Sequence, residues 1–328
     1  MDTILLLGEP TSKRSIYFTK AAAAQGKRVI LRPLFSVVES DLTNCAVKID
    51  PVSYNSSDIA RLEESVQGYS EKLLAISSGR ATFLNTPQDI IRALNKRQTK
   101  AVLRRAGIPV TPELVLEAIQ REALFAAMDA RRPYGVFIKP NHGSGAAGII
   151  AYRRQYSTGR GVAYTTLAKG KGTYHNAKKI YRVDDPSEVA ALLDFAMSKH
   201  PIVELWLPKA RHNGYSYDLR AVVQFGSVDY LVARGSEKMI TNLHLNNHPI
   251  DLAELDMTED VLEQVKDTAS RAVRALSPTL QVAGVDLLLT PDKRLYVIEI
   301  NAQGDLIHQD IYGENSIYQK QVEGMSRL

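Results

Sequence analysis

The chain has a single cysteine, Cys45, and no apolar run long enough to cross a membrane. One cysteine excludes an internal disulfide and a metal site built from several thiolates. Apolar runs such as residues 4–8 are as long as a strand, whereas a membrane-spanning helix needs about 20 apolar residues. The first residues lack the basic start and the long apolar stretch of a secretory signal. These absences lead us to expect a cytoplasmic protein.

Acidic residues are absent from one stretch, residues 153–179, which contains seven Lys and Arg side chains. Tyr156, Tyr164 and Tyr174 are interleaved with them. Such a stretch can pair with phosphates while its tyrosines stack on nucleic-acid bases, close over an anionic substrate, or form a solvated mobile loop. These interpretations remain open, and charge alone does not justify assigning nucleic acid as a partner.

The composition that is present is that of an ordinary globular protein, with 328 residues, 45% apolar and 23% charged. This length allows two or three domains. Residues 1–92 are typical of an open α/β domain. The elements expected there are strands at 3–8, 28–31 and 72–77 and a helix at 13–25. Ser12, Lys13 and Arg14 follow the first strand, where they either face a ligand or simply begin the helix.

The rest of the chain predicts a second α/β unit that opens with one long helix over residues 86–103. Thr86 is a suitable cap, Pro87 suits the first turn, and Gly107 with Pro109 ends the helical pattern. The further elements expected are strands at 136–138, 149–152, 202–207, 219–225 and 228–233 and helices at 186–199 and 258–276. The sequence therefore predicts an α/β fold with α+β subdomains.

Two apolar β-rich runs, residues 284–289 and 296–301, flank a Pro-Asp turn and predict a hairpin. The hairpin brings Asp286, Glu299 and Asn301 to one end of a sheet, and the last two share a face because they are two residues apart. Mg²⁺ takes one or two carboxylates and leaves its other positions to water and phosphate, so these oxygen ligands suit it. Taken singly, each residue is equally well a polar strand end.

Residues 139–148 form a glycine-rich loop between two predicted strands. The loop contains G-x-G-x-x-G, but no helix follows it and the next acid is Asp184, so a dinucleotide-binding fold is not indicated. Glycines between strands let backbone N–H groups cradle phosphate oxygens, and Lys139 adds a positive charge. A protein kinase places its lysine after the glycine loop instead.

The run 201–209 is an apolar strand with one acid, Glu204, and a proline near its end. It suits the wall of an adenine pocket, although without context it is only a buried strand. Further along, Asp218 and Arg220 share a strand face, and Arg234 is expected on the adjacent strand. The arginines either stabilise charge on a transferring phosphoryl group or form surface salt bridges.

These motifs occur in the order of a known superfamily. They are Asn95-Lys96, Gly107-Ile108-Pro109-Val110, VFIKPNHGSGAAGI, PIVELWLPK, YDLRAVV, Arg234, VAGVDLLL and YVIEIN. Over residues 86–305 the series resembles the ATP-grasp superfamily, and within it the glutathione synthetase and ribosomal-protein glutamate ligase branch. The resemblance implies a Rossmann-like pre-ATP-grasp domain at 1–92 and an ATP-grasp domain at 93–328, with a lid at 93–207 and a metal-binding subdomain at 208–328.

The resemblance also implies a role for each matching residue. The residues implied to bind ATP are Lys96, Lys139, His142, Gly143, Ser144, Gly145, Glu204, Leu205, Trp206, Leu207, Asp218 and Asn242. Asp286, Glu299 and Asn301 are implied to hold two Mg²⁺ ions, with Mn²⁺ as a possible substitute. Arg220 and Arg234 are implied to be catalytic, because they would stabilise an acyl phosphate and the tetrahedral intermediate formed when an amine attacks it.

By this resemblance the protein is an ATP-dependent carboxylate–amine ligase that forms an amide or peptide bond and releases ADP and phosphate. Two alternatives remain, an ATP-grasp kinase acting on a small molecule and a non-catalytic ATP-binding regulator. The complete set of metal ligands argues against the regulator. Residues 303–314 are expected to line the acceptor side, but the sequence does not identify the carboxylate or the amine, or whether the acceptor is free, a peptide or carrier-bound. A homodimer also remains open.

Two features depart from the family pattern. Asn246-Asn247 stands where related ligases often have a pair of glycines. The basic, tyrosine-rich stretch at residues 152–179 has no counterpart in the pattern. Our hypothesis is that this stretch helps to recognise an acidic or carrier-bound substrate.

Overall fold

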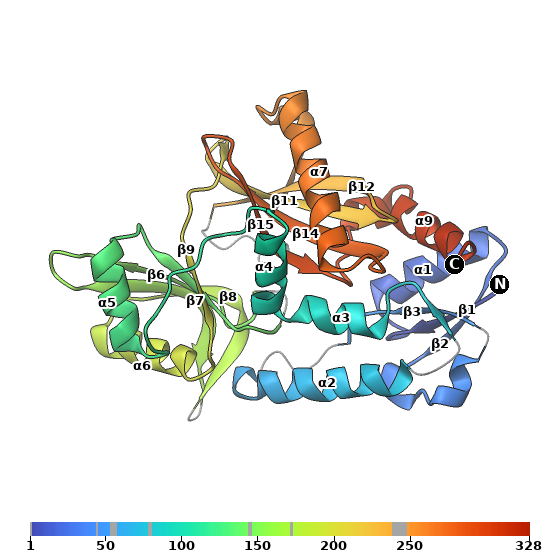
Figure 1. Ribbon diagram of the computed structural model, residues 1–328, viewed down its shortest axis with the longest axis horizontal. Coiled ribbons are helices and arrows are strands. Elements are labelled where there is room, and N and C mark those ends of the chain that lie inside the picture. Colours follow the sequence, from blue (N-terminus) through green and yellow to red (C-terminus); the bar gives the residue numbers. More distant parts are fainter. Residues whose placement is uncertain are drawn as a thin grey trace.

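The computed structural model of the chain describes residues 2–43, 45–52, 58–77, 81–143, 146–170, 173–237 and 248–328. In that part of the chain the strands form three sheets, which we name the N-terminal, middle and C-terminal sheets. Figure 1 shows the middle sheet on the left, the N-terminal sheet on the lower right and the C-terminal sheet above it.

The N-terminal sheet is parallel and has the strand order β2-β1-β3-β4. Its strands are β1 (Thr3–Leu7), β2 (Arg28–Arg32), β3 (Ala46–Ile49) and β4 (Thr82–Phe83). Helix α1 (Lys13–Ala24) begins after Ser12, whose Oγ accepts a hydrogen bond from Ser15 N at 3.1 Å. A parallel sheet with helical connections is an open α/β arrangement, as expected for this part of the chain.

Helix α2 (Leu62–Ile76) occupies the place of the strand expected at residues 72–77, so that prediction is wrong. The buried residues of α2 are Leu62, Val66, Tyr69, Leu73 and Ile76. They recur every three or four residues, which places them on one side of a helix. A short apolar run does not by itself distinguish strand from helix, and here the longer pattern decides.

The single helix expected over residues 86–103 is also wrong, because Asn95 divides it into α3 (Pro87–Leu94) and α4 (Lys96–Arg105). Asn95 has extended backbone angles, φ −94° and ψ 98°, and its side chain accepts a hydrogen bond from Gln98 N at 2.9 Å. Asparagine is a strong N-cap residue, so a new helix starts here.

The middle sheet is antiparallel, in the order β8-β7-β6-β5-β9. Its strands are β5 (Val136–Lys139), β6 (Ile150–Arg154), β7 (Gly161–Lys169), β8 (Tyr174–Val183) and β9 (Ile202–Leu205). Helix α6 (Pro186–Met197) packs on β7 of this sheet, and helix α5 (Arg121–Arg131) packs on α6. The glycine-rich loop joins β5 to β6, which confirms that it lies between two strands.

The basic stretch contributes β7 and β8 to the middle sheet, so the interpretation as a mobile loop is wrong for its described residues. Tyr156 and Tyr174 pack against the core of this sheet. The Tyr174 ring lies 4.9 Å from that of Phe195, centroid to centroid. These rings are occupied by packing, which disfavours the stacking of bases on them. Lys171 and the side chain of Lys178 lie outside what is described.

The C-terminal sheet is antiparallel, in the order β13-β12-β11-β14-β15, with β10 paired to β11. Its strands are β10 (Arg211–His212), β11 (Tyr215–Gln224), β12 (Ser227–Ser236), β13 (His248–Ile250), β14 (Val282–Leu289) and β15 (Leu295–Asn301). Strands β14 and β15 are adjacent and antiparallel, so the predicted hairpin is confirmed.

Helices cover the C-terminal sheet on both sides. Helix α7 (Glu259–Leu276) packs against β11, β12, β14 and β15. Helices α8 (His308–Tyr312) and α9 (Ser316–Met325) follow β15, and α9 packs on α1. Figure 1 shows α9 beside α1, so the end of the chain returns to the N-terminal sheet. In the described residues no helix is both long enough and apolar enough to cross a membrane.

Candidate active site

A cavity of about 1050 Å³ is lined by residues of the middle and C-terminal sheets, of helices α3 and α4, and of the segments that follow β1 and β3. Ligand pockets typically measure about 300–1,000 Å³, so this cavity has room for a nucleotide and a further substrate. The predicted site residues that line it are Lys96, Lys139, His142, Gly143, Glu204, Leu205, Leu207, Asp218, Arg220, Arg234, Asp286, Glu299 and Asn301. The structure therefore brings together residues that are far apart in the sequence.

Trp206 is the one predicted and described site residue that does not line the cavity. Its ring lies against Tyr134 and Phe137, with centroids 5.4 and 5.0 Å away. Its backbone N–H donates to Gly135 O at 2.9 Å. Trp206 thus supports the middle sheet. The predicted residues Ser144, Gly145 and Asn242, and also Asn246-Asn247, lie outside the described residues.

The three expected metal ligands lie together on the β14–β15 hairpin. Asp286 is the register partner of Glu299, and Asn301 Nδ2 donates to Glu299 Oε1 at 3.0 Å. Burial opposes ionisation of Glu299, but the charge of Lys96 and the hydrogen bond from Asn301 lower its pKa below the ordinary value. Burial raises the pKa of Asp286, and the neighbouring charge of Glu299 adds to this effect.

These ligands fit a divalent cation. Arg220 Nε lies 2.6 Å from Asp286 Oδ1 without hydrogen-bonding geometry, so this buried oxygen accepts no hydrogen bond. Two carboxylates and a carboxamide are the hard oxygen donors that Mg²⁺ takes. Among the described residues no group of three or more His, Cys, Asp and Glu side chains is placed to hold a metal. A cation here would therefore depend on Asn301 and on substrate oxygens as well.

The two arginines flank Asp286. Arg220 Nη2 donates to Asp286 Oδ2 at 3.2 Å, and Arg234 Nη2 lies 3.0 Å from Asp286 Oδ1. Arg234 Nε also donates to Asp218 Oδ1 at 2.7 Å, while Lys209 Nζ donates to Asp218 Oδ2 at 3.0 Å. Asp218 and Arg234 are register partners on β11 and β12. The carboxylates therefore hold both guanidinium groups in fixed positions at the cavity wall.

The start of the glycine-rich loop is held between α4 and α2. Lys96 N donates to Asn141 O at 3.1 Å, and Lys96 Nζ donates to Gly143 O. His142 Nδ1 lies 2.6 Å from Glu63 Oε2 on α2. Gly143 has φ +104°, a conformation that favours glycine. Lys96 thus lies beside described residues of the loop that line the cavity.

Glu204 binds two lysines in the cavity wall. Its carboxylate lies 2.7 Å from Lys139 Nζ and 2.8 Å from Lys100 Nζ. Burial opposes ionisation, but the charges of Lys139 and Lys100 lower the pKa of Glu204 to about 2. The backbone N–H of Leu205 donates to Pro112 O at 2.8 Å. The Glu204 carboxylate and the Leu205 N–H therefore both have partners within the protein. Recognition of a base by this strand stays a prediction.

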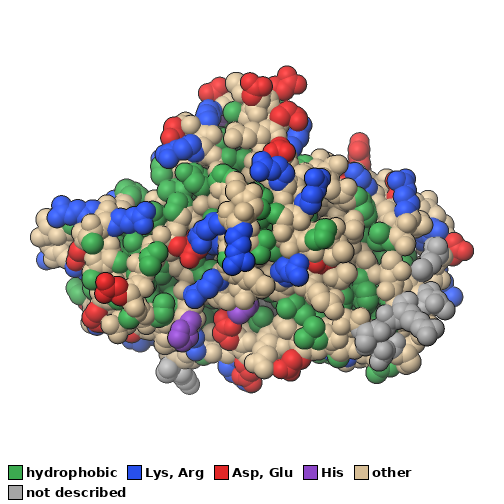
Figure 2. Space-filling model, in the orientation of Figure 1, with side chains coloured by type: hydrophobic (Ala, Val, Ile, Leu, Met, Phe, Trp, Pro, Cys, Tyr) green, Lys and Arg blue, Asp and Glu red, His purple; other side chains and the backbone are tan. Residues whose placement is uncertain are grey.

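Sequence reasoning missed Lys100, although it lines the cavity beside Lys96. A signal was present, because residues four apart share one face of a helix. Helix α4 is also basic on its outer side, where Arg97, Arg104 and Arg105 are exposed. Figure 2 shows Lys and Arg side chains gathered over this part of the surface. Part of the positive charge of the chain therefore lies outside the cavity.

Gly284 allows the chain to approach Arg220 closely. A Cβ atom at Gly284 would overlap Arg220 Nη1 and Gly304 O. We expect Gly284→Ala to lower the free energy of unfolding by about 1–3 kcal/mol, because the backbone of Gly304 would have to move. Gly68→Ala is the matched control, since a Cβ at that position in α2 has nothing within 4 Å. It should instead stabilise by about 0.5–1 kcal/mol. Chemical unfolding measures both, and a Gly284→Ala variant as stable as wild type would contradict the close approach.

The comparisons with known proteins agree with this arrangement. The profile described as YheC/D like ATP-grasp matches residues 119–325, more than half of the chain. The chain therefore belongs to the YheC/D-like ATP-grasp family, and the superfamily expected from the sequence is confirmed. Comparison with curated protein sequences gives no match.

Solved structures share the fold over nearly their whole length. D-cycloserine synthetase DcsG has a TM-score of 0.64 and 14% identity, covering 98% of this chain and 99% of its own. The ATP-grasp ligase PsnB, complexed with a minimal precursor, has a TM-score of 0.61 and 16% identity, covering 100% and 99%. Macrocyclase MdnC of Microcystis aeruginosa MRC, bound with precursor peptide MdnA, has a TM-score of 0.60 and 15% identity, covering 100% of both chains. Family and fold support the expectation of an ATP-dependent ligase at that general level.

Proposed function

We propose that this protein is an ATP-dependent carboxylate–amine ligase that forms an amide or peptide bond through an acyl phosphate and releases ADP and phosphate. The observation that carries the proposal is the single cavity in which lysines, carboxylates and arginines lie together. These groups come from α4, the middle sheet and the C-terminal sheet, so the fold itself assembles them.

The phosphates of ATP would lie between the glycine-rich loop and the β14–β15 hairpin. In this proposal Lys96 and Lys139 contact the phosphate oxygens as positive charges. Asp286, Glu299 and Asn301 would hold the magnesium, which when bound neutralises charge on those oxygens. Two ions are part of the proposal, because the phosphates supply further ligands. Apolar residues of the same cavity, among them Phe137 and Leu205, would enclose the base.

The proposed chemistry needs no protein nucleophile. A carboxylate oxygen of the acceptor attacks the γ-phosphorus, and ADP leaves as the bond to the bridging oxygen breaks. An amine nitrogen then attacks the acyl carbon, and phosphate leaves with the bonding electron pair while the amine loses a proton. Arg220 and Arg234 would stabilise the charge that develops on the transferring group and on the tetrahedral centre. Their fixed positions beside Asp286 supply orientation without rearrangement.

The acceptor would bind where the N-terminal sheet meets the segment after β15. Residues there that line the cavity include Ser12, Lys13, Gln303, His308 and Gln309. PsnB and MdnC are described with precursor peptides, and DcsG as a synthetase of a small molecule. Our proposal therefore includes peptide or carrier-bound acceptors as well as small ones. Asp310, also expected on this side, instead accepts hydrogen bonds from Ser316 and Ile317.

The experiment that tests the proposed function is a screen for phosphate and ADP release from magnesium ATP. Pools of carboxylic acids and amines are supplied, with acidic peptides as a separate arm. A product with a new amide bond, identified by mass spectrometry, is the expected result. Phosphorylation of an acceptor that proceeds fully without an amine would favour the kinase instead. A folded protein that does not bind magnesium ATP would overturn the proposal.

A further inference from the structure

The segment that follows β15 holds the side chain of Arg220, for which we propose a catalytic role. This segment, residues 302–307, joins β15 to α8. Gly304 N donates to Asn301 O at 3.0 Å, which turns the chain back toward the sheet. Gly304 O then accepts a hydrogen bond from Arg220 Nη1 at 3.1 Å. Arg220 therefore has two anchors, the Asp286 carboxylate and the Gly304 carbonyl.

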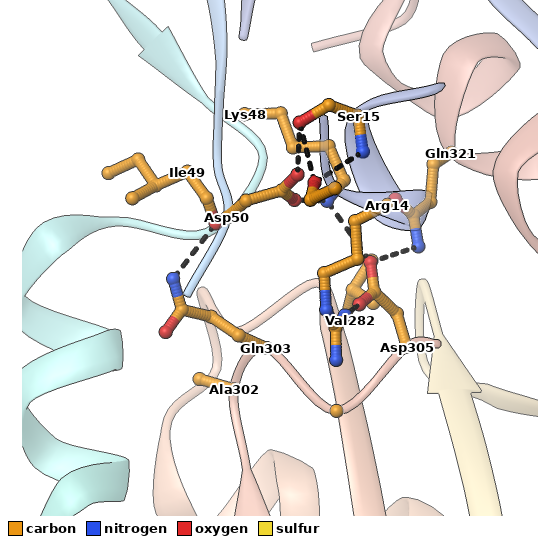
Figure 3. Close-up of polar contacts among 12 residues, drawn as sticks. Arg14, Ser15, Lys48, Ile49, Asp50, Val282, Ala302, Gln303, Asp305 and Gln321 are labelled. Atoms are coloured by element: carbon orange, nitrogen blue, oxygen red, sulfur yellow. Dashed lines mark hydrogen bonds and ion pairs between the residues drawn. The ribbon is translucent and has the colours of Figure 1, made fainter. Parts of the chain in front are cut away.

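The same segment is attached to the N-terminal sheet on both sides of Gly304. Gln303 Nε2 donates to Ile49 O on β3 at 2.9 Å. Asp305 forms an ion pair with Lys48 Nζ of β3 at 3.1 Å and another with Arg14 of α1. Figure 3 shows Gln303 and Asp305 reaching from this segment toward β3 and α1. The position of the Gly304 carbonyl is thus set by contacts with the N-terminal sheet.

These contacts form a cluster of four charges, of which Lys48, Asp50 and Asp305 are buried and Arg14 is partly exposed. Lys48 also pairs with Asp50, and Gln321 Nε2 of α9 donates to Asp305 Oδ2 at 3.2 Å. Asp305 is 2% exposed, Lys48 4% and Asp50 1%. Buried ion pairs often give no more stability than apolar residues of similar volume, although removing one partner is strongly destabilising. Net stabilisation is therefore a weak explanation for the cluster. Its ion pairs do fix the position of the 302–307 segment relative to β3 and α1.

We propose that Asp305 is a positioning residue, which holds the 302–307 segment on Lys48 and Arg14 and thereby sets the place of the Arg220 guanidinium. The inference rests on the proposed function, because Arg220 is assigned a role in it. Asp305 touches no reacting atom and acts through the Gly304 carbonyl. Arg14 also follows Ser12 and Lys13 in the cavity lining, so one cluster ties the acceptor side of the cavity to Arg220.

The test compares two buried aspartates of the same region. Asp305→Asn should lower kcat about 10- to 100-fold, the cost of a misplaced catalytic group, while the KM for ATP changes less than about twofold. Asp310→Asn is the matched control, since Asp310 is 4% exposed and caps α9 by accepting from Ser316 N at 2.9 Å. It should lose stability but keep kcat. Equal kcat in Asp305→Asn and wild type would overturn the inference.

A second measurement separates positioning from general destabilisation. In an Arg220→Ala background, Asp305→Asn should have almost no further effect on kcat, because both changes act through one guanidinium. Additive losses would mean that Asp305 acts elsewhere, and would refute the proposal. Should Asp305→Asn not fold, Gln321→Leu keeps all four charges, loosens Asp305, and should lower kcat in the same direction. An unchanged kcat in that variant would count against the inference.

The inference can also be tested if the proposed function fails. The Nε–H signal of Arg220 in an NMR spectrum of ¹⁵N-labelled protein needs no substrate. We expect it to shift or broaden in Asp305→Asn and to stay in place in Asp310→Asn. A ligase screen without product would then overturn the proposed function alone, whereas an Arg220 signal that is identical in all three proteins would overturn the positioning role.

Discussion

Glu299→Gln is expected to lower the rate of ATP-dependent phosphate release about 1000-fold. The substitution keeps the size of the side chain and removes a charge that sits beside Asp286 and Asn301. If Glu299 holds the metal as proposed, its loss removes several kcal/mol of charge stabilisation, and about 4 kcal/mol corresponds to three powers of ten in rate. Single-turnover and steady-state phosphate release, measured across magnesium concentrations, check this expectation.

Two results define the outcome for Glu299. Glu263→Gln is the control, because Glu263 lies on α7 and forms an ion pair with Lys266 of the same helix, at 2.6 Å. It should release phosphate at the wild-type rate. If Glu299→Gln keeps more than about a tenth of the wild-type rate at every magnesium concentration, then Glu299 does not hold the metal.

Glu204→Gln is expected to lower the free energy of unfolding by about 3 kcal/mol at neutral pH. The pKa of Glu204 falls from its ordinary value of 4.5 to about 2, and each unit is worth about 1.4 kcal/mol. The glutamine would leave Lys100 and Lys139 without their counter-charge, since both lie within 2.8 Å of the carboxylate. Glu113→Gln is the control, because Glu113 is partly exposed and pairs with Arg104, a contact worth less than about 1 kcal/mol.

The pH dependence of that difference has a definite sign. The unfolded chain takes up a proton at Glu204 more readily than the folded chain, so stability from this group is complete above pH 4.5. It is lost as the pH falls from 4.5 toward 2. Denaturant unfolding of wild type and Glu204→Gln between pH 7 and pH 3 should therefore show two curves that converge on the acid side. A constant gap would mean that Glu204 contributes by packing and not by charge.

Part of the fold could be read from local patterns. The β14–β15 hairpin follows from two apolar runs around a Pro-Asp turn, and the glycine-rich loop between β5 and β6 follows from the β-rich residues on both sides. Local patterns failed where the same short run of residues suits either a strand or a helix. The apolar run before Ile76 suits a strand as well as the α2 helix. Helical periodicity alone ran through Asn95, whereas the family motif Asn95-Lys96 implied a helix start there, as the structure has it.

The site shows the same division. Lys139 and Asn301 stand at strand ends and Glu299 stands two residues before one, each within a motif, and the structure places all three on one cavity. Their roles there stay a prediction. Trp206 was grouped with the strand predicted to bind the base, but it lies just beyond the end of β9 and its ring packs on Tyr134 and Phe137. Lys100 could have been predicted from Lys96, because residues four apart share one face of a helix. No local pattern pairs Arg14 with Asp305.

The sequence by itself determined the local placement of the charged groups, because strand ends and turns depend on neighbours in the chain. It placed the Asp286 and Glu299 carboxylates on one hairpin and the lysines beside a glycine-rich loop. The tertiary structure alone decided how these groups are held. Arg14 and Asp305 are 291 residues apart and meet because α1 and β3 pack against the segment after β15. Such contacts depend on how whole sheets pack, and no spacing along the chain encodes them.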